Sequence, residues 1–222
     1  MDNSVSFCEL CSEFTTRVCP FLSPRRSRLL FESRDFLVFP ALGSFVEGYL
    51  LICPRVHVPS YASLEQGLLG KLQNMLDVTK HIVKTYYESP VIFEHGMASC
   101  DRKAGGCIDH AHLHVVPGRV NLTGILSQNF KPEILNGWSN LAAWRGRPYL
   151  LTQAADGPTL ICEVPDHLPS QFLRRYAATA LHVPEHWDWG AYLGLKEIDD
   201  TLGTLRAPFG HVDLEALTGS PR

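Results

Sequence analysis

Short apolar runs separated by polar turns fill much of the first half of the chain and predict β-strands. Residues 28–32, 35–39 and 48–53 are apolar runs of strand length, and Pro54 ends the third. We predict that these three strands form an antiparallel meander. Residues 91–96 form a further run of the same kind, followed by a polar, glycine-rich loop.

A long amphipathic helix is predicted between the third and fourth strands. Apolar residues recur at spacings of three and four from Leu64 to Tyr86, which is the pattern of one buried helix face. Ser63 and Gln66 have the spacing of a capping box at its start. The apolar stripe belongs to the core.

The segment from Cys107 to Pro117 carries three histidines that alternate with apolar residues. Period-two alternation predicts a half-buried strand with the three imidazoles on one face and Ala111, Leu113 and Val115 in the core. Successive histidines are then about 6.6 Å apart along the strand. Imidazole binds metals and acts as a nucleophile or general base, so we favour a functional site over a solvated face.

Other polar residues precede this segment. Glu94 and His95 end the fourth strand and are expected near the three imidazoles if the two strands pair. Gly105 and Gly106 permit a close backbone approach to a ligand, although such a pair is also an ordinary turn. His57 follows the end of the third strand, where it is either a surface residue or part of a site built by the neighbouring strands.

A C-x-x-C pair, Cys8 and Cys11, stands near the start of the chain. Two thiolates at this spacing fit one zinc ion that takes two more ligands from elsewhere. A redox pair and two plain thiols are the alternatives. Seven cysteines is an odd number, which favours thiols or metal ligands over a disulfide frame.

Composition narrows the class of protein. Of the 222 residues 45% are hydrophobic and 19% charged, which is typical of a globular protein. A formal net charge of −3 gives no basic footprint for nucleic-acid polymers. The sequence shows neither a signal peptide nor an apolar stretch of membrane-spanning length, so we expect a cytoplasmic protein without a membrane partner.

The second half has a different character. We predict a core domain over residues 1–120 and an extension over residues 121–222 that packs on it. Residues 148–152 and 159–164 form a hairpin candidate, and a helix is expected from Pro169 to about Leu181. The tail from Leu202 is expected to be loose.

The chain resembles the histidine triad (HIT) superfamily in the run His110-Ala111-His112-Leu113-His114-Val115-Val116. The motif of that superfamily alternates three histidines with apolar residues and ends in two apolar residues. The resemblance extends from about Cys8 to Gly118. It implies an α+β fold with an antiparallel sheet of about five strands, a long helix packed on it, and commonly a two-fold homodimer.

The resemblance also implies an activity, which is cleavage at the α-phosphate of a nucleotidyl ester, anhydride or phosphoramidate. By motif position His112 is the nucleophile and forms a nucleotidyl-histidine, and His114 contacts the phosphate oxygens. A nucleoside monophosphate is released to water by a hydrolase or passed to another acceptor by a nucleotidyltransferase.

Relatives that carry a C-x-x-C pair use it, an upstream histidine and the first triad histidine to bind structural zinc. Cys8, Cys11, His57 and His110 match that set in kind and order. The resemblance therefore implies a zinc site that pins the N-terminal segment beneath the active site.

Several family positions differ here. Ala41 stands where many relatives place a ribose-binding Asp, and Gly106 and Cys107 stand where they carry Gln and then Ser or Thr near the leaving group. Glu94 and His95, together with the altered loop, are our candidates for replacement substrate contacts.

Two other functions stay open. A non-catalytic, zinc-stabilised nucleotide-binding or interaction module is the main alternative to an enzyme. Direct catalytic metal binding by all three triad histidines is disfavoured, because side chains about 6.6 Å apart at the backbone would have to converge considerably.

Overall fold

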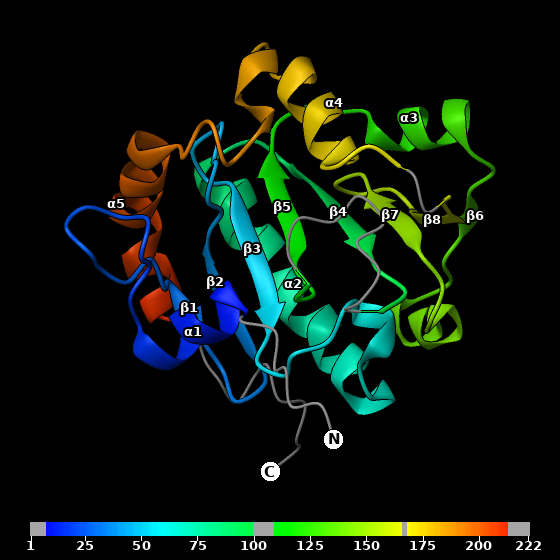
Figure 1. Ribbon diagram of the computed structural model, residues 1–222, viewed down its shortest axis with the longest axis horizontal. Coiled ribbons are helices and arrows are strands. Elements are labelled where there is room, and N and C mark those ends of the chain that lie inside the picture. Colours follow the sequence, from blue (N-terminus) through cyan, green and yellow to red (C-terminus); the bar gives the residue numbers. More distant parts are fainter. Residues whose placement is uncertain (1–7, 100–108, 166–167, 213–222) are drawn as a thin grey trace.

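A single antiparallel sheet runs through the protein (Figure 1). The computed structural model describes residues 8–99, 109–165 and 168–212. In this part of the chain the sheet has eight strands in the order β1-β2-β3-β5-β4-β7-β8-β6. The strands are β1 (Phe31–Glu32), β2 (Phe36–Pro40), β3 (Leu50–Pro54), β4 (Pro90–Gly96), β5 (Leu113–Pro117), β6 (Glu133–Ile134), β7 (Tyr149–Gln153) and β8 (Thr159–Glu163).

Helices connect and cover these strands. The α-helices are α1 (Glu9–Thr16), α2 (Gln66–Tyr86), α3 (Leu122–Asn129), α4 (Phe172–Ala180) and α5 (Leu195–Gly210). Three 3-10 segments complete the fold: η1 (Tyr61–Ser63), η2 (Trp138–Trp144) and η3 (Pro184–Trp187).

The extension continues the sheet. The expected sheet of about five strands corresponds to β1–β5, and β7, β8 and β6 lengthen it to eight. The predicted hairpin is confirmed as β7 and β8, and β7 pairs with β4 from Ile92↔Gln153 to Gly96↔Tyr149. This pairing satisfies backbone groups of β4 that would otherwise form an open sheet edge.

Alternation along the strands produces one hydrophobic core on each face of the sheet. On one face Ile52, Ile92 and Leu113 pack with the buried stripe of α2. On the other face Leu51 and Phe93 pack with residues of α1, α3 and α4. Figure 1 shows α2 behind the sheet and α1 in front of it. The two cores fix both faces of β5, the strand that carries the last triad histidine.

Two local predictions were wrong. The capping box does not form, because Ser63 ends η1 and α2 begins at Gln66 with Glu65 as an N-cap whose side chain makes no capping hydrogen bond. Residues 202–210 are not a loose tail but lie inside α5, whereas residues 213–222 lie outside the described residues. Leu202, Leu205 and Phe209 are buried, and α5 packs against α2 and β2, which holds this segment in place.

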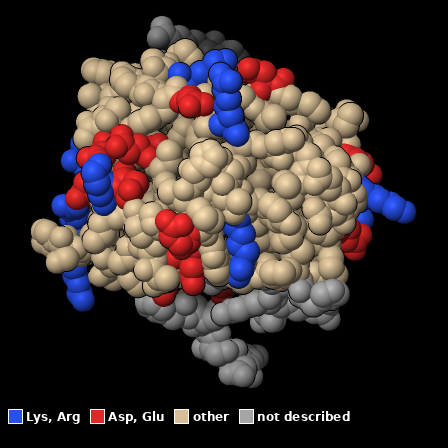
Figure 2. Space-filling model, turned by 90° about the horizontal axis from the view of Figure 1, so that it is seen from above, with Lys and Arg blue, Asp and Glu red and all other residues tan. Residues whose placement is uncertain are grey.

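Charged residues do not gather on the face seen from above in Figure 1. Lysine and arginine alternate there with aspartate and glutamate, and uncharged surface separates the groups (Figure 2). Within the described ranges, each helix is too short or too polar to cross a membrane.

Candidate functional site

The histidine-bearing segment enters the sheet at Leu113, where β5 begins. His114 lies opposite Leu51 of β3 and Phe93 of β4. The core positions predicted from the alternation are confirmed, because Ala111, Leu113 and Val115 are all buried in the core that contains α2. Ahead of the ladder, the amide of Ala111 donates to the carbonyl of Val58 at 2.7 Å.

His112 and His114 line a cavity over the other face of the sheet, where Leu51 and Phe93 lie. The cavity has a volume of about 70 Å³, which is space for about five water molecules at roughly 10–15 Å³ each. Its walls come from the sheet, from the N-terminal segment and from the extension, and include Leu51, Phe93, His95, Gln171 and Arg174. The imidazoles of His112 and His114 meet edge to face, with ring centroids 4.8 Å apart. We call this space the triad cavity.

His112 is held in the tautomer that suits a nucleophile. Its Nδ1 lies 2.7 Å from the carbonyl oxygen of His110. A carbonyl only accepts, so Nδ1 carries the proton and the lone pair is on Nε2. Burial lowers the pKa of His112 below its ordinary value, and the charge of Arg174 lowers it further, against the opposing effect of the hydrogen bond to His110. The imidazole is therefore neutral at physiological pH.

His114 is held in the opposite tautomer. Its Nδ1 lies 2.7 Å from the hydroxyl of Tyr49, and that hydroxyl accepts a hydrogen bond from Nη1 of Arg174 at 2.8 Å. The Tyr49 proton then has His114 Nδ1 as its acceptor, which places the imidazole proton on Nε2. Burial raises the pKa of Tyr49 and is the main cause of a His114 pKa well below the ordinary value, so both groups are neutral.

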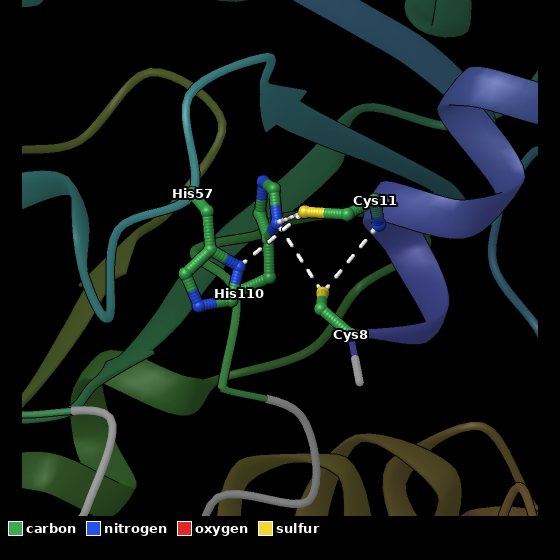
Figure 3. A group of neighbouring side chains, drawn as sticks. All are labelled: Cys8, Cys11, His57 and His110. Atoms are coloured by element: carbon green, nitrogen blue, oxygen red, sulfur yellow. Dashed lines mark hydrogen bonds between the residues drawn. The ribbon is translucent and has the colours of Figure 1, made fainter. Parts of the chain in front are cut away.

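A second cluster of four side chains lies beside the triad. Nδ1 of His110 is 3.6 Å from Sγ of Cys8 and 3.4 Å from Sγ of Cys11. Nδ1 of His57 is 3.4 Å from the same Cys11 sulfur, and all four potential ligand atoms lie within 4.8 Å of one another. Figure 3 shows the four side chains converging from α1, from the loop after β3 and from the start of the triad.

These separations fit a tetrahedral metal site. Zinc–sulfur bonds of about 2.3 Å and zinc–nitrogen bonds of about 2.0–2.1 Å give sulfur–nitrogen edges of about 3.6 Å. Nε2 of His110 lies 2.8 Å from the carbonyl oxygen of Pro54, so Nδ1 keeps its lone pair for a metal. Burial lowers the pKa of His110 to about 4, which keeps this imidazole neutral.

The two cysteines are placed by a helix that the sequence did not predict. Cys8 is the N-cap of α1, and its sulfur accepts a hydrogen bond from the amide of Cys11. Burial and the neighbouring Cys8 raise the pKa of Cys11 to about 12, so without a metal this thiol stays protonated. A bound cation would supply the positive charge that stabilises two thiolates there.

The family comparison places the triad within a known domain. Residues 24–121 match the family model described as the HIT domain. This segment is a HIT domain. It includes His57 and all three triad histidines, whereas Cys8, Cys11 and Arg174 lie outside the matched range. Both clusters thus combine residues of the HIT domain with residues from outside it.

Solved HIT proteins resemble part of the chain. A hypothetical histidine triad nucleotide-binding protein from Sulfolobus tokodaii covers 50% of this chain and 68% of its own, with 19% identity and a TM-score of 0.40. A HIT family hydrolase from Clostridium thermocellum covers 60% and 100%, with 15% identity and a TM-score of 0.37. A zinc-bound histidine triad family protein from Mycobacterium smegmatis covers 61% and 91%, with 18% identity and a TM-score of 0.38. The comparison with curated proteins found no match.

The predicted substrate-contact residues have different positions relative to the HIT domain's triad. His95 lines the triad cavity with His112 and His114. Glu94 does not, because neighbouring strand residues point to opposite faces. Its carboxylate is buried and accepts hydrogen bonds from the Tyr61 amide at 2.8 Å and the Tyr149 hydroxyl at 2.7 Å. Gly106 and Cys107 lie outside the described residues.

Two residues of the site were missed by sequence reasoning. Tyr49 lies at the start of an apolar run, where an aromatic residue predicts only core packing. Arg174 lies on the predicted extension helix beside Arg175, and charged residues on helices are usually solvated. A signal for Arg174 was the absence of any acid within four positions on either side of it, which excludes a local helical ion pair.

Proposed function

We propose that this chain hydrolyses or transfers a nucleotidyl group, cleaving at the α-phosphate of a nucleotidyl ester, anhydride or phosphoramidate. The main support is the pair of opposite tautomers in the triad cavity of a HIT domain. His112 presents an Nε2 lone pair, and His114 presents an Nε2 proton beside it. One group suits attack on phosphorus, and the other suits donation to a phosphoryl oxygen.

The first step forms the covalent intermediate. The Nε2 lone pair of His112 attacks the α-phosphorus, and the bond from phosphorus to the leaving group breaks. The leaving group departs with the bonding electrons and takes up a proton from solvent. The His114 Nε2–H donates a hydrogen bond to a phosphoryl oxygen as negative charge develops there. The product is a nucleotidyl-His112 whose Nδ1 proton stays bound to the carbonyl of His110.

The second step releases the nucleotide. The oxygen of water attacks phosphorus and loses a proton, the phosphorus–nitrogen bond breaks, and the electron pair returns to Nε2 of His112. A nucleoside monophosphate leaves, and the neutral imidazole is restored. A phosphate or sugar phosphate in the position of water would make the reaction a nucleotidyl transfer.

Intact-protein mass spectrometry after a brief reaction and an acid quench tests this proposal. Adenosine phosphoramidate and diadenosine polyphosphates are suitable substrates. We expect a mass increase of one adenylyl group in the wild type and none in His112→Ala. A matched control is His186→Ala, because His186 lies on η3 and stacks on Tyr192 rather than in the triad cavity. An adduct in the His112→Ala variant would refute the assignment.

We further infer that Cys8, Cys11, His57 and His110 bind one zinc ion. This inference is supported by the sulfur–nitrogen separations of 3.4–3.6 Å and by the hydrogen bond from Nε2 of His110 to the carbonyl oxygen of Pro54. Four protein ligands would close a tetrahedral coordination sphere, so the ion would be structural. It would hold α1 against the triad segment and leave the reaction to the imidazoles.

A non-catalytic nucleotide-binding module is the second candidate. Ala41, Gly106 and Cys107 favour it, because they stand where many relatives carry groups that contact the ribose and the leaving group. Single-turnover kinetics separate the two functions. A burst of nucleoside monophosphate equal to the enzyme concentration supports catalysis, whereas binding without release supports the module.

The homodimer implied by the resemblance stays a prediction. In the described residues β4 is paired on both sides, by β5 and by β7, so a dimer would have to use another surface than the edge of β4. Light scattering coupled to size-exclusion chromatography tests it, and a mass of 24.8 kDa would identify a monomer.

A further inference from the structure

Two buried arginines line the triad cavity, and they differ in their charge balance. Arg28 forms a two-pronged ion pair with Glu13, with both nitrogen–oxygen distances at 2.8 Å. Arg174 donates to the carbonyls of Trp187 and Gly43 at 3.0 and 2.7 Å and to the hydroxyl of Tyr49 at 2.8 Å. All three acceptors are neutral, and in the described part of the chain Arg174 forms no ion pair.

A buried cation without a counter-charge is energetically costly, even when its hydrogen bonds are satisfied. Only 5% of the surface of Arg174 is exposed, so solvent does not screen its charge effectively. An imidazole has no negatively charged form at physiological pH, so the histidines of the cavity cannot balance it. Two acids also line the cavity, and one of them, Glu13, pairs with Arg28. The other, Glu9, is exposed and forms no ion pair with Arg174, so the Arg174 guanidinium has no paired counter-charge.

The position of Arg174 adds to this charge. It lies in the first turn of α4, a nine-residue helix whose N-terminal residues Gln171, Phe172 and Leu173 also line the cavity. No acidic residue occupies that turn, and the side chain of its N-cap residue, Gln171, makes no capping hydrogen bond. The positive end of the helix dipole is therefore directed at the same space as the guanidinium.

Arg174 also keeps donors available. A guanidinium has five N–H groups, and the three hydrogen bonds to Trp187, Tyr49 and Gly43 use three of them. The remaining two lie one on each terminal nitrogen. A guanidinium with free terminal N–H groups is suited to phosphate oxygens, which it binds through charge-assisted hydrogen bonds.

We propose that Arg174 binds the anionic phosphoryl group of the substrate, so that helix α4 of the extension completes the binding site of the HIT domain. This inference rests on the proposed function, because it places the phosphoryl group beside His112 and His114. It gives the extension a role in substrate binding. The same guanidinium also positions His114 through Tyr49. Because Arg174 donates a hydrogen bond to the Tyr49 hydroxyl oxygen, the hydroxyl proton points to Nδ1 of His114.

Thermal unfolding of the zinc-loaded protein in inorganic phosphate tests the proposal without turnover. Potassium chloride at matched ionic strength controls for screening. A ligand that binds only the folded state raises the melting temperature as its concentration rises. We expect phosphate to stabilise the wild type beyond chloride. A wild type that responds equally to both salts would overturn the proposal without any variant.

Variants identify the residue that binds phosphate. In Arg174→Gln we expect phosphate affinity to fall by about tenfold to a hundredfold, the loss typical of a charged hydrogen bond. Arg174→Lys should recover part of that affinity. The matched control is Arg175→Gln, because Arg175 is exposed, stacks on Trp187 and leaves the triad cavity unchanged. Wild-type phosphate affinity in Arg174→Gln contradicts the proposal.

A crystal structure of the wild type grown with phosphate decides the question if Arg174→Gln does not fold. We expect the ion within hydrogen-bond distance of Arg174, and a phosphate bound only elsewhere would overturn the inference. The wild type separates this inference from the proposed function. Wild-type protein that binds phosphate at Arg174 but forms no adduct with any of the nucleotide substrates would refute the reaction alone.

Discussion

Glu94 makes the stability of the protein depend on pH between about 5 and 8. Burial raises the pKa of this carboxyl from 4.5 to about 7, although hydrogen bonds from Tyr149 and Tyr61 oppose the shift. In the unfolded chain the carboxyl titrates at its ordinary value. The folded protein therefore binds the proton more tightly, and in this window it carries more protons than the unfolded chain.

The sign and size of the effect follow from linkage. Stability falls as pH rises wherever the folded state holds more protons. A carboxyl pKa raised from 4.5 to about 7 corresponds to about 3 kcal/mol in total, and most of this, about 2–3 kcal/mol, is lost between pH 5 and pH 8. Glu94 therefore contributes most favourably at acid pH, and this contribution is lost as pH rises through about 7.

Glu94→Gln isolates this contribution. Glutamine keeps an acceptor for the Tyr61 amide and does not titrate. The difference in unfolding free energy between variant and wild type should therefore move by about 2–3 kcal/mol in favour of the variant from pH 5 to pH 8. Urea unfolding followed by tryptophan fluorescence at four pH values measures it. The cysteine and histidine ligands titrate in both proteins, and their contributions cancel in the difference.

An exposed carboxyl provides the control. Glu163 pairs with Arg147 at the surface, where both side chains are about half exposed, and Glu163→Gln should leave the pH profile unchanged. A difference between Glu94→Gln and wild type that stays constant with pH would refute the reasoning, because it would mean that Glu94 keeps its ordinary pKa in the folded protein.

Three further predictions concern the metal, the triad and the C-terminal helix. The purified protein should contain about one zinc ion per chain by mass spectrometry. The zinc content should fall several-fold in Cys11→Ser and stay unchanged in Cys162→Ser, and equal zinc content in both variants would count against the site. Tyr49→Phe removes the hydroxyl that donates to Nδ1 of His114, which costs about 1–3 kcal/mol of hydrogen-bond energy. We therefore expect kcat to fall about tenfold to a hundredfold, and an unchanged kcat would disprove the tautomer assignment. Leu205→Ala should cost about 2–5 kcal/mol of stability in urea, because Leu205 is fully buried; a negligible cost would mean that α5 does not pack on the core.

Local pattern accounts for most of the elements found. The strands and the hairpin follow from apolar runs of strand length, and the long helix follows from apolar residues at spacings of three and four. The tail beyond Leu202 shows where such reasoning fails. Ile198, Leu202, Leu205 and Phe209 have helical spacing, but Gly203 and Pro208 disfavour a helix locally, and packing against α2 and β2 overrides that preference.

The sequence by itself determined the triad motif and the C-x-x-C pair, because spacing is a property of residue type and order, and its resemblance to the HIT superfamily added His57 and His110 as the other two expected zinc ligands. Only the tertiary structure separated Glu94 from His95. Both are polar neighbours at the end of one strand, and their opposite orientation decides that one packs against Tyr61 and Tyr149 while the other lines the triad cavity.

The tertiary structure also decided what surrounds the histidines. Tyr49 and Arg174 are 125 positions apart in the chain, and no periodicity links them. They meet because β7 and β8 continue the sheet from β4, and α4 then packs in the same core as Tyr49. That packing brings a buried guanidinium beside His112 and His114, an arrangement that depends on long-range packing and not on local sequence.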